Sequence, residues 1–231
     1  MKTIGLLGGM SWESSLEYYR IINEGVKTKL GGHHSAKCLM YSLDFHEIEH
    51  YQHLDDWDAA TALMIDGAQR VERGGAECLV ICTNTMHKMA EDVQAAIDIP
   101  IIHIADATAQ RVRDAGIQHI GLLGTAFTME HDFYKGRLID HFGLNVHIPN
   151  DDDREIVHRV IYDELVLGTI NPSSRAQYRE IMAKLVEGGA QGVILGCTEI
   201  ELLVQPEDTQ VPQFPTTQIH AEAAVAWALD S

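Results

Sequence analysis

The chain has 231 residues, of which 45% are hydrophobic and 22% are charged, and its formal net charge is −17 at pH 7. This length suffices for one large domain or two modest ones, each with its own buried core. Nucleic-acid binding depends on Lys and Arg side chains that neutralise phosphates, so the negative charge argues against DNA, RNA and anionic membranes as partners. A small acidic ligand remains compatible with this charge, because donors inside a pocket decide its binding.

The first fifteen residues, "MKTIGLLGGMSWESS", do not contain the apolar stretch of a signal peptide, and no window reaches the ~20 apolar residues of a membrane helix. We therefore predict a cytoplasmic protein. In a reducing compartment cysteines are expected to be free thiols. The four cysteines, which show no CxxC spacing, are Cys38, Cys78, Cys82 and Cys197.

Short apolar runs alternate with longer amphipathic stretches along the first third of the chain. The pattern predicts strands at 3–8, 37–45 and 77–82, and helices at 14–31 and 57–75. Such alternation is typical of βαβ units and a mostly parallel sheet. Active sites in such sheets lie beyond the carboxyl ends of the strands.

The same order of segments then recurs. Residues 3–19 resemble 119–134, residues 74–85 resemble 188–199, and residues 99–110 resemble 211–224. Three matches in the same order predict an α/β fold of two pseudo-symmetric lobes, each a mostly parallel sheet flanked by helices. We expect the first lobe at 1–100 plus 211–231 and the second at 101–210.

Two of the repeated segments end in small polar clusters, "CTNT" at 82–85 and "GCTE" at 196–199. Aligning "GGAECLVICTNT" with "GGAQGVILGCTE" without gaps sets Thr83, and not Cys82, opposite Cys197. Strand alternation directs Cys82 to the other face, so we predict that Cys82 is a small buried hydrophobe.

Two groups at equivalent strand ends of related lobes can act on opposite faces of one small substrate. This arrangement suits removal of a proton from one face and its return on the other. A cysteine just before a helix start is expected to have a lowered pKa, because the helix N-terminus favours the thiolate. The polar residues that follow can cap the helix or bind a carboxylate.

The motifs "CTNTMH" and "GCTE", with "GLLGGMSW", "SLDF", "LLGT" and "IHIADAT", resemble the aspartate/glutamate racemase family over nearly the whole chain. The resemblance implies an isomerase, an amino-acid racemase that works without pyridoxal phosphate, and hence no cofactor and no metal. It implies a small acidic amino acid as the ligand. We also expect a homodimer.

The family usually carries a cysteine in each lobe, whereas here Thr83 stands at the first position and Cys197 at the second. A threonine hydroxyl is too weak an acid to supply a resting base at neutral pH. The resemblance therefore implies that Cys197 takes the α-proton of L-glutamate or L-aspartate, and that Thr83, directly or through water, serves the opposite face. We predict an L preference in kcat.

The resemblance also implies residues that hold the substrate. Glu199 is expected to meet the ammonium group. The predicted substrate-binding residues are Met10, Gln52, Asn84, Thr85, Met86, Thr125, Thr198 and Glu199. Relatives with an Arg or Lys for the side-chain carboxylate place it near 48–53 or 164–167, where this chain has Gln52, His53 and Val166.

Several alternatives stay open. Cys197 is alternatively a buried core thiol, Thr83 a helix cap, and His87 either a partner of Thr83 or a packing residue. His46, His50 and His53 share a helical face that could hold a metal, although a solvated or pocket-rim segment fits better. The run at 150–155 is most simply a charged loop before a helix. Other functions are a single-cysteine decarboxylase or cis-diacid isomerase of the same superfamily, or a non-catalytic amino-acid sensor.

Overall fold

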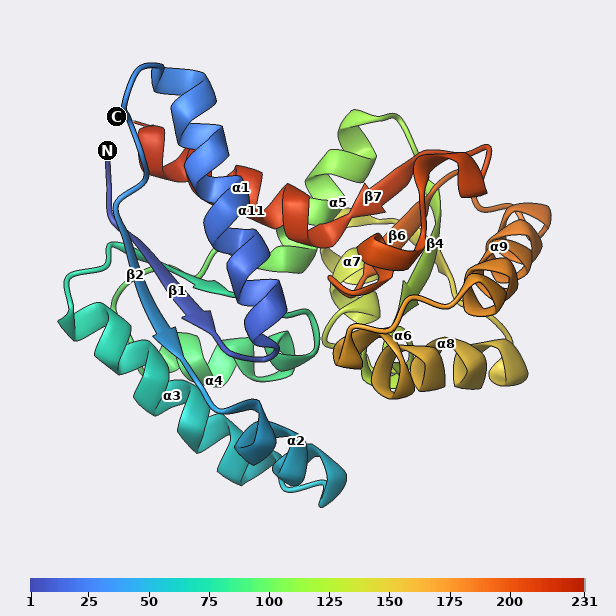
Figure 1. The fold of residues 1–231 in the computed structure, drawn as a ribbon, viewed down its shortest axis with the longest axis horizontal. Coiled ribbons are helices and arrows are strands. Elements are labelled where there is room, and N and C mark those ends of the chain that lie inside the picture. The colour runs from blue at the N-terminus through green and yellow to red at the C-terminus, as the bar shows by residue number, and fades with distance from the viewer. Residues whose placement is uncertain (231) are drawn as a thin grey trace. The chain divides into compact units, whose positions relative to one another are not determined.

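The computed structural model describes residues 1–230 and has the predicted α/β fold with two parallel sheets flanked by helices (Figure 1). The described chain divides into two compact units. The first unit comprises Met1–Ile104 and the segment that begins at His220, and the second comprises Ala105–Ile219. The sequence predicted 101–210 for the second lobe, so the second unit begins four residues later and ends nine residues later than predicted.

The first unit is built around a three-stranded sheet of order β2-β1-β3, with all strands parallel. Its elements are β1 (Ile4–Gly8), α1 (Trp12–Leu30), β2 (Cys38–Ser42), α2 (Phe45–His53), α3 (Trp57–Arg73), β3 (Cys78–Ile81), the 3-10 helix η1 (Thr85–Met89) and α4 (Ala90–Ala95). The predicted strand at 37–45 ends early, because Asp44 caps α2 by accepting a hydrogen bond from the His46 amide at 3.1 Å.

The two faces of this sheet bury two separate apolar clusters. Alternate strand residues, among them Leu6 and Val80, pack with α1 and with α11 (Thr216–Leu229). The intervening residues, among them Leu7 and Ile81, pack with α2, α3, η1 and α4. The period of two along each strand therefore assigns every side chain to one helical layer, and Figure 1 shows α1 and α11 together on one side.

The second unit contains a four-stranded parallel sheet of order β5-β4-β6-β7. Helices α6, α8 and α9 contact β4, and α10 contacts β6. Its elements are α5 (Ile104–Asp114), β4 (His119–Gly124), α6 (Ala126–Glu130), α7 (Lys135–Phe142), β5 (Asn145–His147), α8 (Asp151–Asp163), η2 (Leu165–Leu167), α9 (Pro172–Glu187), β6 (Val193–Gly196), α10 (Ile200–Leu203), η3 (Pro206–Asp208) and β7 (Gln213–Pro215).

The predicted charged loop at 150–155 is instead the start of α8. Asn150 caps this helix by accepting from the Asp153 amide at 2.9 Å, and the acidic run occupies the first turn. Negative side chains are favourable there because the helix N-terminus carries partial positive charge. The prediction was wrong because a run of acidic residues is also typical of a loop, and the Asn150 cap that marks the start of a helix was not considered.

The last repeated segment differs most between the units. In the second unit β7 pairs with β6 as a strand, whereas in the first unit the equivalent pairing is a single bridge between Leu79 and Ile101. In each case a helix follows: α5 after the bridge and α11 after β7. Nearly all of α5 belongs to the second unit, and α11 from His220 onward belongs to the first.

Candidate active site

The carboxyl ends of β3 and β6 occupy equivalent positions in their sheets. Leu7 of β1 lies opposite Ile81, and Gly124 of β4 lies opposite Gly196. Extending the first register by one residue sets Cys82 opposite Gly8, and the Cys82 amide donates to the Leu7 carbonyl at 2.9 Å. Thr83 and Cys197 therefore follow the sheet at the same place, as the ungapped alignment predicts. We call residues 82–85 the first strand end and residues 196–199 the second strand end.

Cys82 has no access to solvent and belongs to the apolar cluster shared with α1 and α11. Burial raises the pKa of its thiol far above the ordinary range. The prediction that Cys82 is a buried hydrophobe is confirmed. At the matching position of the second strand end, a Cβ on Gly196 would lie 2.7 Å from the Leu123 carbonyl oxygen. The second sheet thus has no room for the side chain that the first sheet buries.

Thr83 is partly exposed and lies just before η1, whose N-cap residue is Asn84. The helix-cap alternative for Thr83 is therefore wrong. Within residues 1–230 only its main-chain atoms have hydrogen-bond partners: its amide donates to the Ile81 carbonyl at 2.9 Å, and its carbonyl lies 2.7 Å from His87 Nδ1. The hydroxyl of Thr83 is left available for a ligand or for water.

His87 makes two main-chain hydrogen bonds that fix its protonation. A carbonyl only accepts, so the hydrogen on Nδ1 is donated to Thr83 O, and Nε2 accepts from the Ile104 amide at 3.3 Å. The ring is therefore neutral. His87 holds the backbone of Thr83, and the predicted role as a partner of Thr83 takes this main-chain form.

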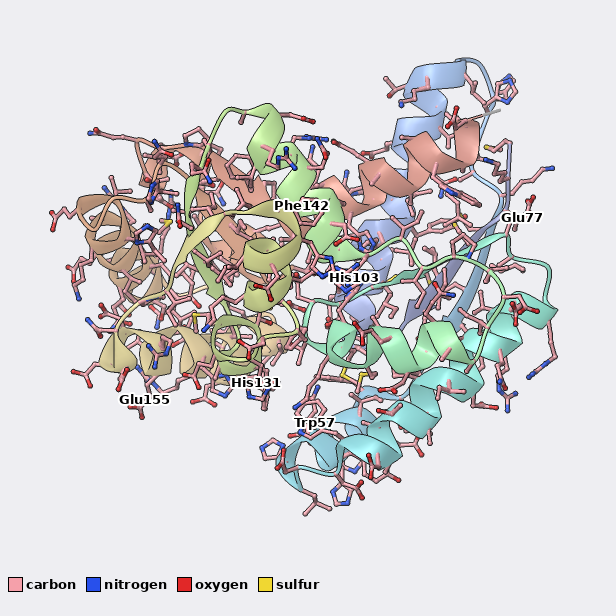
Figure 2. All side chains as sticks on the ribbon, turned by 180° about the vertical axis from the view of Figure 1, so that it is seen from behind. Trp57, Glu77, His103, His131, Phe142 and Glu155 are labelled. Atoms are coloured by element: carbon pink, nitrogen blue, oxygen red, sulfur yellow. The ribbon has the colours of Figure 1, made fainter. Side chains whose placement is uncertain are left out.

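Two more histidines lie beside His87, and one of them, His103, is labelled in Figure 2. The ring centres of His103 and His220 lie 4.6 Å and 5.5 Å from that of His87. His220 is fully buried; its Nδ1 lies 2.8 Å from the Tyr18 hydroxyl, and its Nε2 lies 2.6 Å from the Ile102 carbonyl. Burial lowers the pKa of His220 to about 4, so this ring is also neutral at pH 7.

Sequence reasoning missed Tyr18 and His220 as supports of the first strand end. A signal for His220 was present, because the third repeat pairs "IHIADAT" with "IHAEAA" and so sets His220 in the place of His103. Nothing in the sequence marks Tyr18, which reads as one apolar position of α1. Its contact with His220 arises only because α11 returns to the first sheet.

The second strand end has a different support. Cys197 as a residue is partly exposed and therefore lies outside the apolar core, although its thiol is largely shielded from water. Its Sγ donates to Glu199 Oε2 at 2.9 Å. Burial of the thiol, followed by the negative charge of Glu199 and the hydrogen bond to it, raises the pKa of Cys197 well above its ordinary value. We predicted a lowered pKa from a helix start, which is wrong: α10 spans only four residues, and the Glu199 amide lowers the pKa less than its carboxylate raises it.

The other predicted residues are distributed between the two units. Gln52, Asn84, Thr85 and Met86 are buried in the first unit, as is Met10, and Gln52 Nε2 lies 3.2 Å from Met86 Sδ. In the second unit Thr125 caps α6 by accepting from the Thr128 amide, and the hydroxyls of Thr198 and Thr217 are hydrogen-bonded at 2.9 Å. The carboxylate of Glu199 contacts Cys197, and its expected contact with the substrate ammonium group stays a prediction.

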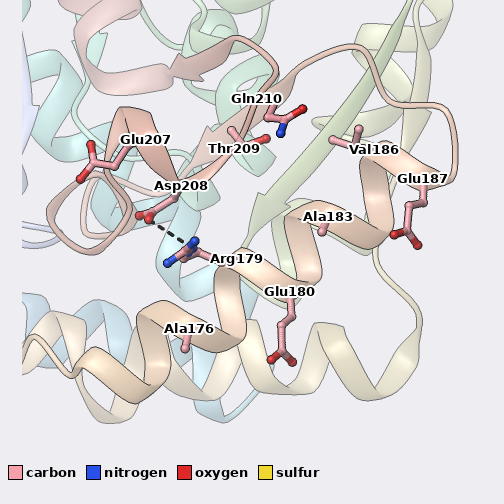
Figure 3. Close-up of a pocket in the computed structure, with 10 residues that line it drawn as sticks. All are labelled: Ala176, Arg179, Glu180, Ala183, Val186, Glu187, Glu207, Asp208, Thr209 and Gln210. Carbon is pink, nitrogen blue, oxygen red and sulfur yellow. Dashed lines mark ion pairs between the residues drawn. The ribbon is translucent and has the colours of Figure 1, made fainter.

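The second unit also carries a hollow of about 700 Å³ between α9 and the segment at 207–210 (Figure 3). It contains the ion pair of Arg179 with Asp208, whose N–O distance is 3.5 Å. Its lining residues are Ala176, Arg179, Glu180, Ala183, Val186, Glu187, Glu207, Asp208, Thr209 and Gln210. None of the predicted site residues lines this hollow, which is therefore separate from the two strand ends.

Two general features of the described chain bear on its function. No group of three or more His, Cys, Asp or Glu side chains within residues 1–230 is arranged to hold a metal ion, and this includes the histidines of α2. No helix over the same residues has the length and apolar character needed to cross a bilayer.

The fold and the matched strand ends define the class: an α/β protein of two related units with a polar cluster after one strand of each. The model of the Asp/Glu/Hydantoin racemase family matches residues 7–224, and the chain belongs to this family. Membership makes it an isomerase of the racemase type.

Similar proteins agree with this assignment. The crystal structure of a Yersinia pestis protein proposed to be an Asp/Glu racemase is 54% identical, covers 100% of both chains and has a TM-score of 0.94. An aspartate racemase homologue from Pyrococcus horikoshii OT3 is 34% identical with the same coverage and a TM-score of 0.86. The broad specificity amino-acid racemase RacX of Bacillus subtilis (strain 168) is 20% identical over 74% of this chain and 73% of its own length.

Proposed function

We propose that the protein racemises L-glutamate, L-aspartate or both without pyridoxal phosphate, with Cys197 as the base for the L isomer and Thr83 on the opposite face of the substrate. The observation that carries this proposal is the equivalence of Thr83 and Cys197 in the registers of the two sheets. A substrate must meet both strand ends during turnover. The similarity to an aspartate racemase homologue supports an acidic amino acid as the substrate.

Cys197 is the better base because sulfur loses its proton far more readily than an aliphatic hydroxyl. Thr83 then delivers a proton to the other face, directly or through a water molecule. Its hydroxyl is suited to this because it has no hydrogen-bond partner within residues 1–230, while its backbone is held by His87. The chain thus has one strong and one weak acid–base group for the two directions.

The substrate carboxylates need hydrogen-bond donors. We assign this role to five polar residues and to the segments that contain Met10 and Met86. The polar residues are Gln52, Asn84, Thr85, Thr125 and Thr198. Their near-complete burial supports this role, because a buried donor binds an anion without competition from bulk water. Gln52 would meet the side-chain carboxylate.

Homodimer assembly and a cytoplasmic location stay predictions.

Because Thr83 and Cys197 differ, kcat and KM can each differ between the two enantiomers, but kcat/KM cannot. Because L and D isomers have equal free energy in water, a racemase has equal kcat/KM for both. We expect kcat to be higher from the L isomer, with a KM higher by the same factor. Values of kcat/KM that differ clearly between the two isomers would contradict simple racemisation.

The decisive experiment incubates the protein with L-glutamate or L-aspartate in D2O and follows the α-proton by NMR together with optical rotation. Loss of the α-proton signal accompanied by loss of rotation is expected. Exchange with retained rotation would mean that the Thr83 face does not return a proton. Binding without exchange would favour a sensor.

The single thiol at the two matched positions favours one alternative enzyme, a decarboxylase or a cis-diacid isomerase that needs only one cysteine. Malonate-type acids and cis diacids assayed beside the amino acids distinguish it. Release of carbon dioxide or isomerisation of a diacid, without amino-acid exchange, would replace the racemase proposal.

A further inference from the structure

The contact between Cys197 and Glu199 extends the proposed function, on which the following inference rests. Sγ donates to Glu199 Oε2 at 2.9 Å, and the Glu199 side chain is held in place because the residue is only 7% exposed. We propose that Glu199 accepts the thiol proton of Cys197, so that the base for the L isomer is the Cys197–Glu199 pair and not a free thiolate.

A free thiolate at this place would lie beside a carboxylate in poorly solvated surroundings. Burial penalises ionisation of the thiol most strongly, Glu199 is the charged group that acts most strongly on it, and Glu201 of α10 adds negative charge. Each of these groups disfavours a second negative charge. A single charge shared between sulfur and carboxylate avoids that repulsion, and such a pair titrates as one unit.

The proton transfers balance without any oxidant or further reactant. The Sγ–H proton moves to Glu199 as the sulfur electron pair takes the α-proton of the L isomer, and the electrons of the Cα–H bond stay on the substrate. Cys197 is then again a thiol, and Glu199 is a neutral acid. The carbanion takes a proton from Thr83 or its water, and the proton on Glu199 returns through solvent to replace it.

This role differs from the contact with the substrate ammonium group that the sequence suggested for Glu199. The 2.9 Å distance from Cys197 Sγ to Glu199 Oε2 is the evidence for this role. The spacing of the two residues in the sequence does not predict the contact, because residues i and i+2 of a helical turn do not face each other. In this role Glu199 supports catalysis through Cys197, and its removal should change how activity depends on pH.

The test compares the wild-type enzyme with Glu199→Gln, Glu199→Asp and the surface control Glu187→Gln, which removes one charge from the exposed end of α9. Two curves are recorded against pH: iodoacetamide labelling of the Cys197 peptide by mass spectrometry, and kcat/KM for α-proton exchange from the L isomer. Peptide mapping separates Cys197 from the other three cysteines.

In Glu199→Gln the labelling midpoint should fall by about one pH unit or more, because a neighbouring negative charge is lost. Exchange at pH 7 should drop at least ~10-fold, and its acid limb should move to higher pH, because the thiol alone must now ionise. The two curves thus move in opposite directions, which general damage to the fold does not produce. Glu187→Gln should match the wild type.

An unchanged labelling midpoint in Glu199→Gln, with exchange intact in the wild type, would overturn the assignment of Glu199 alone. If Glu199→Gln does not fold, Glu199→Asp decides: its acid limb should stay at the wild-type pH with a lower rate, and an alkaline shift would refute the pair. Absence of exchange in the wild type would instead overturn the proposed racemisation.

Discussion

The two strand ends occupy the same place in two related sheets, yet the protein supports them in different ways. At the first, the backbone of Thr83 is held by His87 while its hydroxyl makes no hydrogen bond within residues 1–230. At the second, the Cys197 side chain itself is engaged by Glu199. The comparison indicates that a repeated fold can place two side chains at equivalent positions while their neighbours give them different surroundings.

The largest effect should come from removing the thiol of the second strand end. Cys197→Ser should lower α-proton exchange from the L isomer by roughly 10²–10⁴-fold, because a hydroxyl is a much weaker acid than a thiol. NMR in D2O measures this rate. Thr83→Ser is the matched control at the first strand end, where the hydroxyl is retained and only a small change is expected. Full activity in Cys197→Ser would refute the assigned base.

A second large effect concerns the histidines that support the first strand end. The pKa of His220 is about 4 in the folded protein and near 6.5 when unfolded, so the unfolded chain binds a proton more readily below pH 6.5. This contribution to stability is complete above about pH 6.5 and is lost as pH falls toward 4, by up to about 3 kcal/mol. Urea unfolding at several pH values measures it.

The control for that experiment is His220→Gln, whose amide can still donate to the Ile102 carbonyl but does not titrate. It should unfold at lower urea concentration at pH 7, and its stability should decline less between pH 7 and pH 5 than that of the wild type. Parallel pH profiles for the two proteins would show that His220 is not the group responsible.

A smaller effect is expected when the two strand ends are made alike. Thr83→Cys places a thiol at both matched positions and should raise kcat from the D isomer by about tenfold, because a stronger acid–base group then serves that face. Initial rates by circular dichroism from pure D and L isomers measure the change. If only stability changes, Thr83 does not face the α-carbon.

The smallest effect should come from the cysteine next to Thr83. Cys82→Ala removes one buried sulfur from the cluster shared with α1 and α11, and should cost about 1 kcal/mol of unfolding free energy with kcat unchanged. Thermal unfolding and the exchange assay test the two halves of this prediction. A loss of activity larger than the loss of folded protein would show that Cys82, and not its neighbour, takes part in catalysis.

The sequence could predict most of the fold because the relevant signals are local. Alternation identified β1, α1, α3 and β3, and the ungapped repeat correctly aligned Thr83 with Cys197 before any register was known. The start of α8 was missed, although its Asn150 cap is readable, because a run of acidic residues resembles a loop.

The surroundings of the candidate site could not be predicted in the same way. The contact of Glu199 with Cys197 depends on how four residues turn after β6, and the pKa of Cys197 depends on burial that no motif encodes. The contact of Tyr18 with His220 joins side chains 202 positions apart. These contacts and the pKa of Cys197 depend on tertiary packing. The local sequence pattern determines the helices and strands but not which side chains meet between them.

The position of α11 affects how a fragment of the protein should behave when it is expressed alone. From His220 onward this helix covers the sheet made by the first hundred residues, so a fragment ending at the midpoint of the repeat would expose the apolar face that Ala221, Ala224 and Val225 bury. Such a fragment should aggregate when expressed alone and be rescued when its missing C-terminal half is supplied in trans. The two repeated halves are therefore expected to depend on each other for folding.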